Sequence, residues 1–249
     1  MQPSSADLRL SCNPNWSFMR TILTLALASS LSYAAAQSKE ISVPAFTELT
    51  IAGPYKTTLV KSDKNKVEIN YNGVDPDDVV IDSGGGELEI KIRQSIFDFD
   101  RYDDHNRNRQ ATVTVYYSST LTDIELKQGA SLRSKETLTA KQMRISSSMG
   151  SEVRLDLKIE DLTLESSMGS EVDLTGTASN FEVTAKMGSD VDASQLKSQD
   201  VQVRASMGAS VQVYAERELD ASANFGASVT CKGNPPRKKT SGTFGADFH

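Results

Sequence analysis

A short glycine motif returns seven times between residues 127 and 247, and no other feature constrains the fold of this chain as strongly. Successive glycines are separated by 21, 19, 19, 20, 18 and 19 residues. The copies are Gln128-Gly129-Ala130-Ser131, Met149-Gly150-Ser151-Glu152, Met168-Gly169-Ser170-Glu171, Met187-Gly188-Ser189-Asp190, Met207-Gly208-Ala209-Ser210, Phe225-Gly226-Ala227-Ser228 and Phe244-Gly245-Ala246-Asp247. A fixed period of this size is typical of stacked structural repeats.

Apolar and polar residues alternate on both sides of each glycine. With the glycine as position zero, apolar residues recur at positions −7, −5, +3 and +5, and mostly polar residues stand between them. Alternation with period two is typical of a strand with one buried face, so each repeat is predicted to hold two short strands. A helix is disfavoured, because no apolar stripe with a period of 3.6 residues runs through these segments.

The predicted fold is all-β: a single-domain parallel β-solenoid with coils of about 19 residues. The glycine segment would turn a corner between the two strands, and glycine there suggests a positive φ or close packing. Position −1 forms a ladder of mostly large apolar side chains, and position +1 is always Ala or Ser. Polar links between coils are expected at 158–161, 176–180 and 194–200. A sandwich or barrel of antiparallel hairpins is the alternative, but it would need a tight turn such as Asn-Gly at every strand change.

The first residues are predicted to be a targeting segment. Arg20 precedes the uncharged apolar run 21–31, and the run is followed by Ser32-Tyr33-Ala34-Ala35-Ala36. This order is typical of a secretory signal peptide over residues 1–36, and the run is too short for a stable membrane span. We expect Met19 to be the true start, because residues 1–18 make a poor signal lead.

Removal of residues 1–36 would take away Asp7, Arg9 and Arg20 and change the formal net charge from −6 to −7. A negative exported chain is a poor candidate for nucleic-acid binding. One cysteine, Cys231, would remain, and its inward +5 position predicts a small buried residue without an internal disulfide partner.

Residues 41–118 form a less regular β section that precedes the regular coils of 119–249. We expect this section to contain the first coils and to cap one end of the solenoid, within one domain over residues 37–249. Ser83-Gly84-Gly85-Gly86 predicts a hairpin-type link between two of its strands. A charged insert separates the last two strands, between Arg93 and Ala111.

A family resemblance rests on several of these segments. Phe46–Gly53 followed by Tyr55–Val60 resembles the opening of the exported bacterial auto-transporter adhesin head domain, called the GIN domain. Segments 122–131, 171–173, 190–196 and 233–235 are similar to its later Gly-Ser-Gly-Asp and Gly-Asn-Pro patterns. The chain departs from the family where Ser-Gly-Ser-Gly is replaced by Ser-Met-Gly-Ser. The resemblance implies an exported β-helical protein of Gram-negative bacteria and transfers no catalytic residue.

Carboxylates recur beside the corner and suggest a cation site. If the coils stack in register, Glu171, Asp173, Asp190 and Asp192 form a two-by-two acidic patch. Like charges about 5 Å apart repel, so a hard cation or a basic partner is favoured there. The competing interpretation is a solvated outer face that Arg154, Lys186 and salt screen, because Ca²⁺ prefers six to eight oxygen ligands.

The charged insert suggests a second site. Aromatic and acidic residues interleave in it, which predicts a tip that contacts a glycan or a protein. The candidate ligand-binding residues are Phe97, Asp98, Phe99, Asp100, Tyr102 and Asp103. A polar loop without a ligand is the competing interpretation.

Together these features predict an exported, non-enzymatic interaction or adhesion module of the periplasm, outer cell surface or medium, without a cofactor. A glycan or an envelope protein is the expected partner, and no transmembrane segment is expected. An envelope assembly protein that self-associates through its solenoid ends is the first alternative. A carbohydrate-active enzyme is the second, disfavoured because glycosidases need two positioned acids and the chain has only two histidines, His105 and His249.

Overall fold

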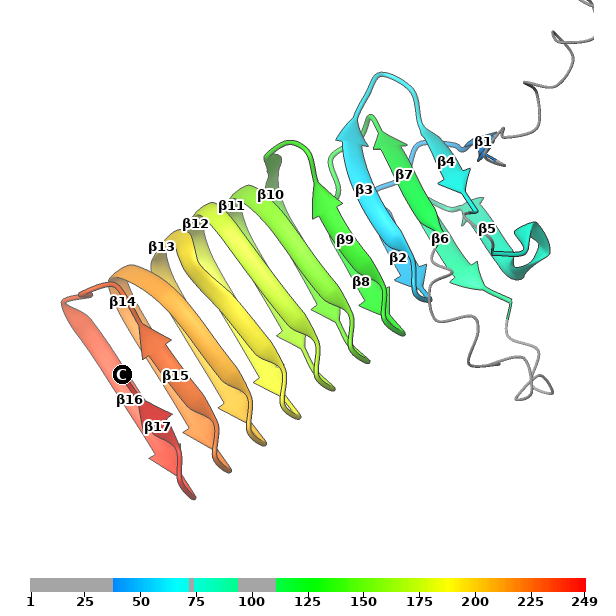
Figure 1. Ribbon diagram of the computed structural model, residues 1–249. Coiled ribbons are helices and arrows are strands. Elements are labelled where there is room, and N and C mark those ends of the chain that lie inside the picture. The colour runs from blue at the N-terminus through cyan, green and yellow to red at the C-terminus, as the bar shows by residue number, and fades with distance from the viewer. Residues whose placement is uncertain (1–37, 72–73, 94–110) are drawn as a thin grey trace, which may run out of the picture. The chain divides into compact units, whose positions relative to one another are not determined.

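The repeats that the glycine motif marks in the sequence form a stack of parallel β-coils in the structure (Figure 1). The computed structural model describes residues 38–71, 74–93 and 111–249, which all belong to one unit over residues 37–249. The strands are β1 (Ser38–Ser42), β2 (Glu48–Ala52), β3 (Lys56–Lys61), β4 (Lys66–Asn70), β5 (Val79–Gly84), β6 (Glu87–Ile92), β7 (Thr112–Tyr117), β8 (Asp123–Lys127), β9 (Ser131–Ser134), β10 (Leu138–Ser147), β11 (Glu152–Ser166), β12 (Glu171–Lys186), β13 (Asp190–Ser206), β14 (Ser210–Asn224), β15 (Ser228–Cys231), β16 (Arg237–Thr243) and β17 (Asp247–Phe248). The predicted all-β solenoid is confirmed.

Each regular coil is one long strand that runs from one glycine turn to the next. β11, β12, β13 and β14 have 15, 16, 17 and 15 residues, and each pairs in parallel with the strand before it. The prediction of two short strands per repeat was therefore wrong in one respect. The links expected at 158–161, 176–180 and 194–200 are continuous strand, because they keep pairing with their neighbours while the chain bends back.

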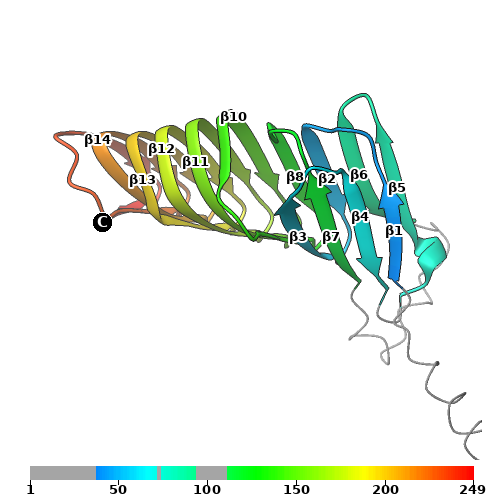
Figure 2. The ribbon, with the colours of Figure 1, turned by 90° about the horizontal axis from the view of Figure 1, so that it is seen from above.

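This second bend is marked by a break in the alternation of buried and exposed residues. In β11 the break falls at Glu160 and Asp161, which are both exposed between buried Ile159 and Leu162. In β13, the longest strand, extra residues are absorbed between Ala193 and Lys197, where the register with β14 shifts. Each coil thus consists of two arms, one on either side of the second bend. The core lies between the two layers of strands that these arms form (Figure 2).

The core consists of the inward residues of both arms. The columns at −7, −5, +3 and +5 are buried through most of the stack, with members such as Ile145, Leu164, Val172 and Val211. Cys231, expected to be buried, is only partly so, and its thiol lies 3.7 Å from the carbonyl oxygen of Gly233. In β16 the chain no longer supplies apolar inward residues, and all seven residues of that strand are exposed.

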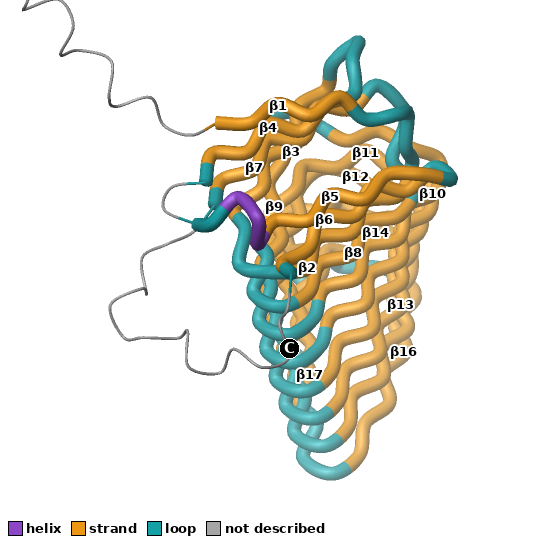
Figure 3. Tube along the Cα trace, turned by 90° about the vertical axis from the view of Figure 1, so that its right-hand side faces the viewer, coloured by secondary structure: helices purple, strands orange, loops and turns teal. Residues whose placement is uncertain are grey.

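The N-terminal section adds two coils and a set of antiparallel strands. β2 lies between β6 and β8, and β3 lies between β7 and β9, all in parallel. β1 pairs with β4, β4 with β7 and β5 with β6, and these pairs are antiparallel (Figure 3). The first coil along the chain is therefore enclosed between two coils that come later in the sequence.

Helix is confined to one short piece in the part of the chain that the structure describes. It is a 3-10 helix over Pro76–Asp78, capped by the side chain of Asp75, which accepts a hydrogen bond of 3.0 Å from the backbone N–H of Asp77. None of the described residues forms a helix long and apolar enough to cross a membrane.

Candidate functional site: an apolar ridge along the glycine turns

Every glycine corner is a tight turn with two residues in the left-handed region. Met149 has φ 56° and Gly150 has φ 69°, and the N–H of Ser151 donates to the carbonyl of Ser148 at 3.3 Å. Positive φ at both central residues is the geometry of a type I′ turn, which Asn-Gly usually fills. The predicted positive φ of the glycines is confirmed, and the residue before each glycine shares it, with φ between 52° and 59°.

Hydrogen bonds fix these turns above one another. The N–H of Gly150 donates to the carbonyl of Met168 at 3.1 Å, and the N–H of Gly169 donates to Met187 at 3.1 Å. The same bond recurs from Gly129 through Gly226. The turns stay in register along the lower edge of the stack (Figure 1), so the residues before the glycines follow one another in a row.

Buried serines support three of the turns from inside. The hydroxyls of Ser166 and Ser170 lie 2.8 Å apart, and the Ser170 hydroxyl donates to the carbonyl of Ser147 in the preceding coil at 3.0 Å. Ser147 and Ser151 repeat the hydroxyl contact at 3.0 Å. This network satisfies polar groups under the corner and holds the turn geometry.

The row of side chains before the glycines faces solvent, and we call it the Met–Phe ridge. Its members are Met149, Met168, Met187, Met207, Phe225 and Phe244. Their exposed fractions run from 46% at Met187 to 76% at Phe244. These six residues are all the large hydrophobic residues that are exposed in the described part of the chain. The predicted ladder exists, but it lies outside the core.

The ridge breaks two local rules at each of its positions. A non-glycine residue in the left-handed region is disfavoured by roughly 1 kcal/mol or more, and Asn is tolerated there better than Met or Phe. A large apolar side chain in water also loses the hydrophobic gain that burial would give it. Positions that break local rules repeatedly are candidates for function.

Carboxylates border the ridge on one side. Position +2 carries Glu152, Glu171, Asp190 and Asp247 in four of the coils. On the other side, position −2 is mostly Ser, Asn or Thr, with Lys127 and Lys186 as its charged members. The ridge is thus an apolar line with an acidic margin.

The predicted acidic patch does assemble. Glu171 pairs in register with Asp190, and Asp173 pairs with Asp192. Arg154 of the preceding coil already engages two of the four carboxylates, at 2.9 Å from Asp173 and 3.4 Å from Glu171, and it also contacts Glu152. No group of three or more metal-ligating side chains is found among the described residues, and metal binding at this patch stays a prediction.

Asp192 is held in its charged form. Burial would raise the pKa of this carboxylate, but hydrogen bonds from Ser194 and the nearby charge of Lys232 outweigh it, so the pKa lies below its ordinary value. The N–H of Ser194 donates to Asp192 at 2.9 Å, and the Lys232 ammonium donates to the Ser194 hydroxyl at 2.9 Å. This carboxylate therefore has local partners and does not depend on a cation.

The predicted ligand-binding residues of the insert lie outside the described residues. Phe97, Asp98, Phe99, Asp100, Tyr102 and Asp103 all fall in the range 94–110. The strands on either side of that range are described: the end of β6 pairs with the end of β2, and the start of β7 pairs with the start of β3. Ligand binding by the insert stays a prediction.

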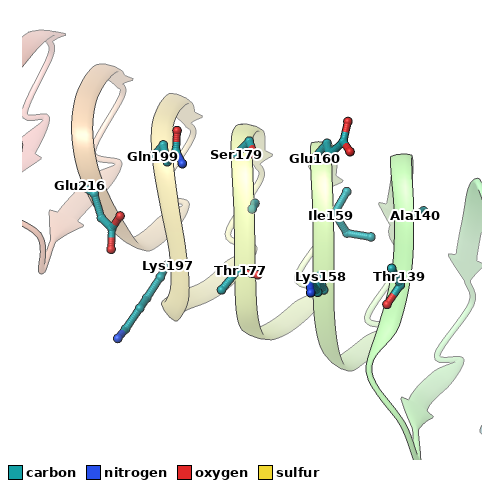
Figure 4. Close-up of a pocket in the computed structure, with 11 residues that line it drawn as sticks. Thr139, Ala140, Lys158, Ile159, Glu160, Thr177, Ser179, Lys197, Gln199 and Glu216 are labelled. Atoms are coloured by element: carbon teal, nitrogen blue, oxygen red, sulfur yellow. The ribbon is translucent and has the colours of Figure 1, made fainter.

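The second bend of the coils carries an open groove lined by both polar and apolar side chains. Its volume is about 380 Å³, and its floor crosses β10 to β14 (Figure 4). Short polar and charged side chains from successive coils line it, including Thr139, Lys158, Thr177 and Lys197. It has no aromatic side chain on which a sugar ring could stack, so it is a weaker candidate than the ridge.

Sequence reasoning found the column of the ridge but not its exposure. The exposure could have been inferred from the glycine that follows each of these residues. A residue followed by glycine in a tight turn indicates a type I′ turn, which holds its first central side chain away from the sheet. A large apolar residue at a position where Asn is usual then marks an exposed apolar site.

Solved structures of similar fold include proteins from Bacteroides and Parabacteroides species. A "putative adhesin" from Bacteroides fragilis has a TM-score of 0.71 and 20% identity, covering 85% of this chain and 94% of that one. A "putative lipid binding protein" from Parabacteroides distasonis has a TM-score of 0.60 and 18% identity, covering 86% and 96%. A "putative adhesin" from Parabacteroides distasonis has a TM-score of 0.61 and 16% identity, covering 86% and 96%. At these identities the likeness establishes the fold.

No curated protein matches the sequence. A family model does match, and it covers residues 45–235, the coils, turns and ridge up to Phe225 included. The family resemblance seen at Phe46–Gly53 is confirmed, and the chain belongs to the family described as "Putative auto-transporter adhesin, head GIN domain".

Proposed function

We propose that this chain is an exported, non-enzymatic interaction module that attaches to a partner at the cell envelope or surface through its Met–Phe ridge. One observation carries the proposal: six large apolar side chains stand in a single exposed row, on a backbone geometry that favours Asn or Gly. Contiguous exposed apolar surface is typical of a contact site.

The family supports the class of function. Its description names an adhesin, and the solved neighbours carry adhesin or lipid-binding names. Export is supported by that description and by the signal peptide predicted over residues 1–36. The net charge of −6 favours a partner other than nucleic acid.

The chemistry of the described side chains also supports a non-enzymatic role. Glu152, Glu171 and Asp173 contact Arg154, and Asp192 accepts a hydrogen bond from Ser194, as structural charges do. His249, the histidine within the described residues, lies 3.0 Å from Asp247 on the exposed last strand.

A binding assay with envelope fragments from the source cells tests the proposal. The protein is labelled and compared with a ridge variant, Met168→Asn/Met187→Asn/Met207→Asn. The matched control is Thr163→Asn/Thr184→Asn/Gln202→Asn, which changes three outer-face residues of the same coils and keeps the charge. We expect saturable binding that falls roughly tenfold in the ridge variant only.

Two results would contradict the proposal. If the unchanged protein does not bind, the interaction role is wrong. If both triple variants bind like the unchanged protein, the contact lies elsewhere on the solenoid.

A further inference from the structure

Building on the proposed function, we infer that the partner of the Met–Phe ridge is a lipid bilayer surface, on which the ridge lies lengthwise with a preference for zwitterionic over anionic lipid. Four features of the ridge lead to this choice: its shape, its area, its side-chain chemistry and its margin of charge.

The ridge is convex. Each of its side chains stands at the tip of a tight turn, and the turns are hydrogen-bonded into one line. Five steps of about 4.8 Å separate Met149 from Phe244, so the line is roughly 24 Å long. A protein partner would need a groove of that length, whereas a bilayer deforms around any row of apolar tips.

The area of the ridge is too small for a stable dimer. Its exposed apolar surface is on the order of 600 Å². A stable interface takes about 800 Å² from each partner. Two identical rows, each one side chain wide, would bury only part of that surface against each other, so a second copy is the poorer occupant.

The side chains suit shallow insertion. Met is unbranched and adapts its shape to a disordered surrounding, and Phe settles at the boundary of headgroups and acyl chains. The ridge places Met in its first four positions and Phe in its last two, where exposure rises to 58% at Phe225 and 76% at Phe244. The deepest contact is therefore expected at the Phe225–Phe244 end.

The charges beside the ridge select the lipid. Glu152, Glu171, Asp190 and Asp247 line one margin. Arg154 offsets part of this charge, and Lys186 stands on the opposite margin. The remaining negative charge repels anionic headgroups within a Debye length, about 8 Å at physiological salt.

Flotation with vesicles of pure phosphatidylcholine tests the inference. We expect the unchanged protein to float with the vesicles and the ridge variant Met168→Asn/Met187→Asn/Met207→Asn to bind at least roughly tenfold more weakly. The control Thr163→Asn/Thr184→Asn/Gln202→Asn should bind like the unchanged protein. Replacing 30% of the lipid by phosphatidylglycerol should weaken binding at low salt, and added salt should restore it.

The outcomes separate this inference from the proposed function. Envelope binding that depends on the ridge, without flotation on pure lipid, would keep the interaction role and overturn the lipid partner in favour of a protein. Flotation that the ridge variant retains would also overturn it. Sedimentation equilibrium gives a third check: a dimer that the ridge variant loses would show that a second copy covers the ridge.

Discussion

The rings of Phe225 and Phe244 stack with their planes 1° apart and their centroids 5.2 Å apart. They occupy the same position in successive coils, and the N–H of Gly226 donates to the carbonyl of Phe244 at 3.1 Å. Aromatic pairs contribute about 0.5–1.5 kcal/mol beyond the buried area. The ridge therefore holds its own side chains in line at this end.

Asparagine on the ridge should not harm the fold. In Met187→Asn the new side chain tolerates φ 55° better than Met does, so we expect an unfolding free energy equal to or higher than that of the unchanged protein. Urea titration followed by circular dichroism measures it. A loss above about 1 kcal/mol would mean that stacked Met side chains stabilise the solenoid, which would remove the main argument for a contact role.

Two glycines with positive φ should respond differently to alanine. At Gly176 a Cβ would lie 2.0 Å from the carbonyl oxygen of Leu157, so Gly176→Ala is expected to cost at least about 3 kcal/mol or prevent folding. At Gly150 a Cβ meets open space, so Gly150→Ala should cost only the backbone strain, about 1–2 kcal/mol. Thermal unfolding measures the loss of stability in each variant. Equal losses of stability in the two variants would contradict the close backbone packing at the second bend.

The serines under the turn should act as a pair. Ser170→Ala leaves the Ser166 hydroxyl without its partner and removes one of the two hydrogen bonds that the Ser147 carbonyl accepts, the other coming from the N–H of Ser167, at an expected cost of about 1–2 kcal/mol. The double variant Ser166→Ala/Ser170→Ala should cost less than the sum of the single variants, since the coil of Ala205 and Ala209 builds the same turn with alanine. A double-mutant cycle measures the coupling, and strict additivity would argue against it.

Tyr55 should make the protein sensitive to alkali. Burial, with smaller contributions from Asp78 and Tyr71, raises the pKa of this phenol in the folded state well above its ordinary value of about 10. The unfolded state therefore releases the proton first, and stability present below pH ~10 is lost as the pH rises further.

The variant Tyr55→Phe isolates this effect. Its stability should fall less steeply above pH ~10. At neutral pH it should be no less stable, because the Tyr55 hydroxyl is buried without a hydrogen-bond partner among the described residues. The measurement is the urea midpoint of unfolding of both proteins across the alkaline pH range. If the two midpoints fall in parallel as the pH rises, the loss of stability comes instead from Tyr71 and Tyr117, whose pKa values are also raised by burial.

Removal of Arg154 tests the acidic patch. Its side chain is about half exposed, so Arg154→Gln should change stability by less than about 1 kcal/mol. The change frees Glu171 and Asp173, and if the patch binds a cation, CaCl₂ should raise the melting temperature of the variant more than that of the unchanged protein. Calcium without effect on either protein would show that the predicted metal site is wrong.

The sequence was sufficient for the coils because their signals are local. Glycine at position zero and alternation at residues such as Leu162, Thr163 and Leu164 report directly on a turn and on a strand with one buried face. The second bend was missed because Glu160 and Asp161 resemble a loop, although their backbone stays paired to the neighbouring coils. Local composition does not reveal which backbone segments pair across coils.

The candidate site was harder to predict for a similar reason. Met168 looks like a core residue by type, and only the left-handed backbone of its turn carries it outward. The acidic patch was placed correctly by register, and Arg154 was already named as a group that could screen it. Its contacts with Asp173 and Glu171 also depend on side-chain reach across neighbouring coils.

The position of the β2–β3 coil has a consequence for how the protein is made. This coil leaves the ribosome before every other coil, yet its two edges are occupied by β6–β7 on one side and β8–β9 on the other. A solenoid that begins at its terminal coil can lengthen in one direction only. Here the earliest coil is internal, so later segments of the chain must pair with it at both of its edges.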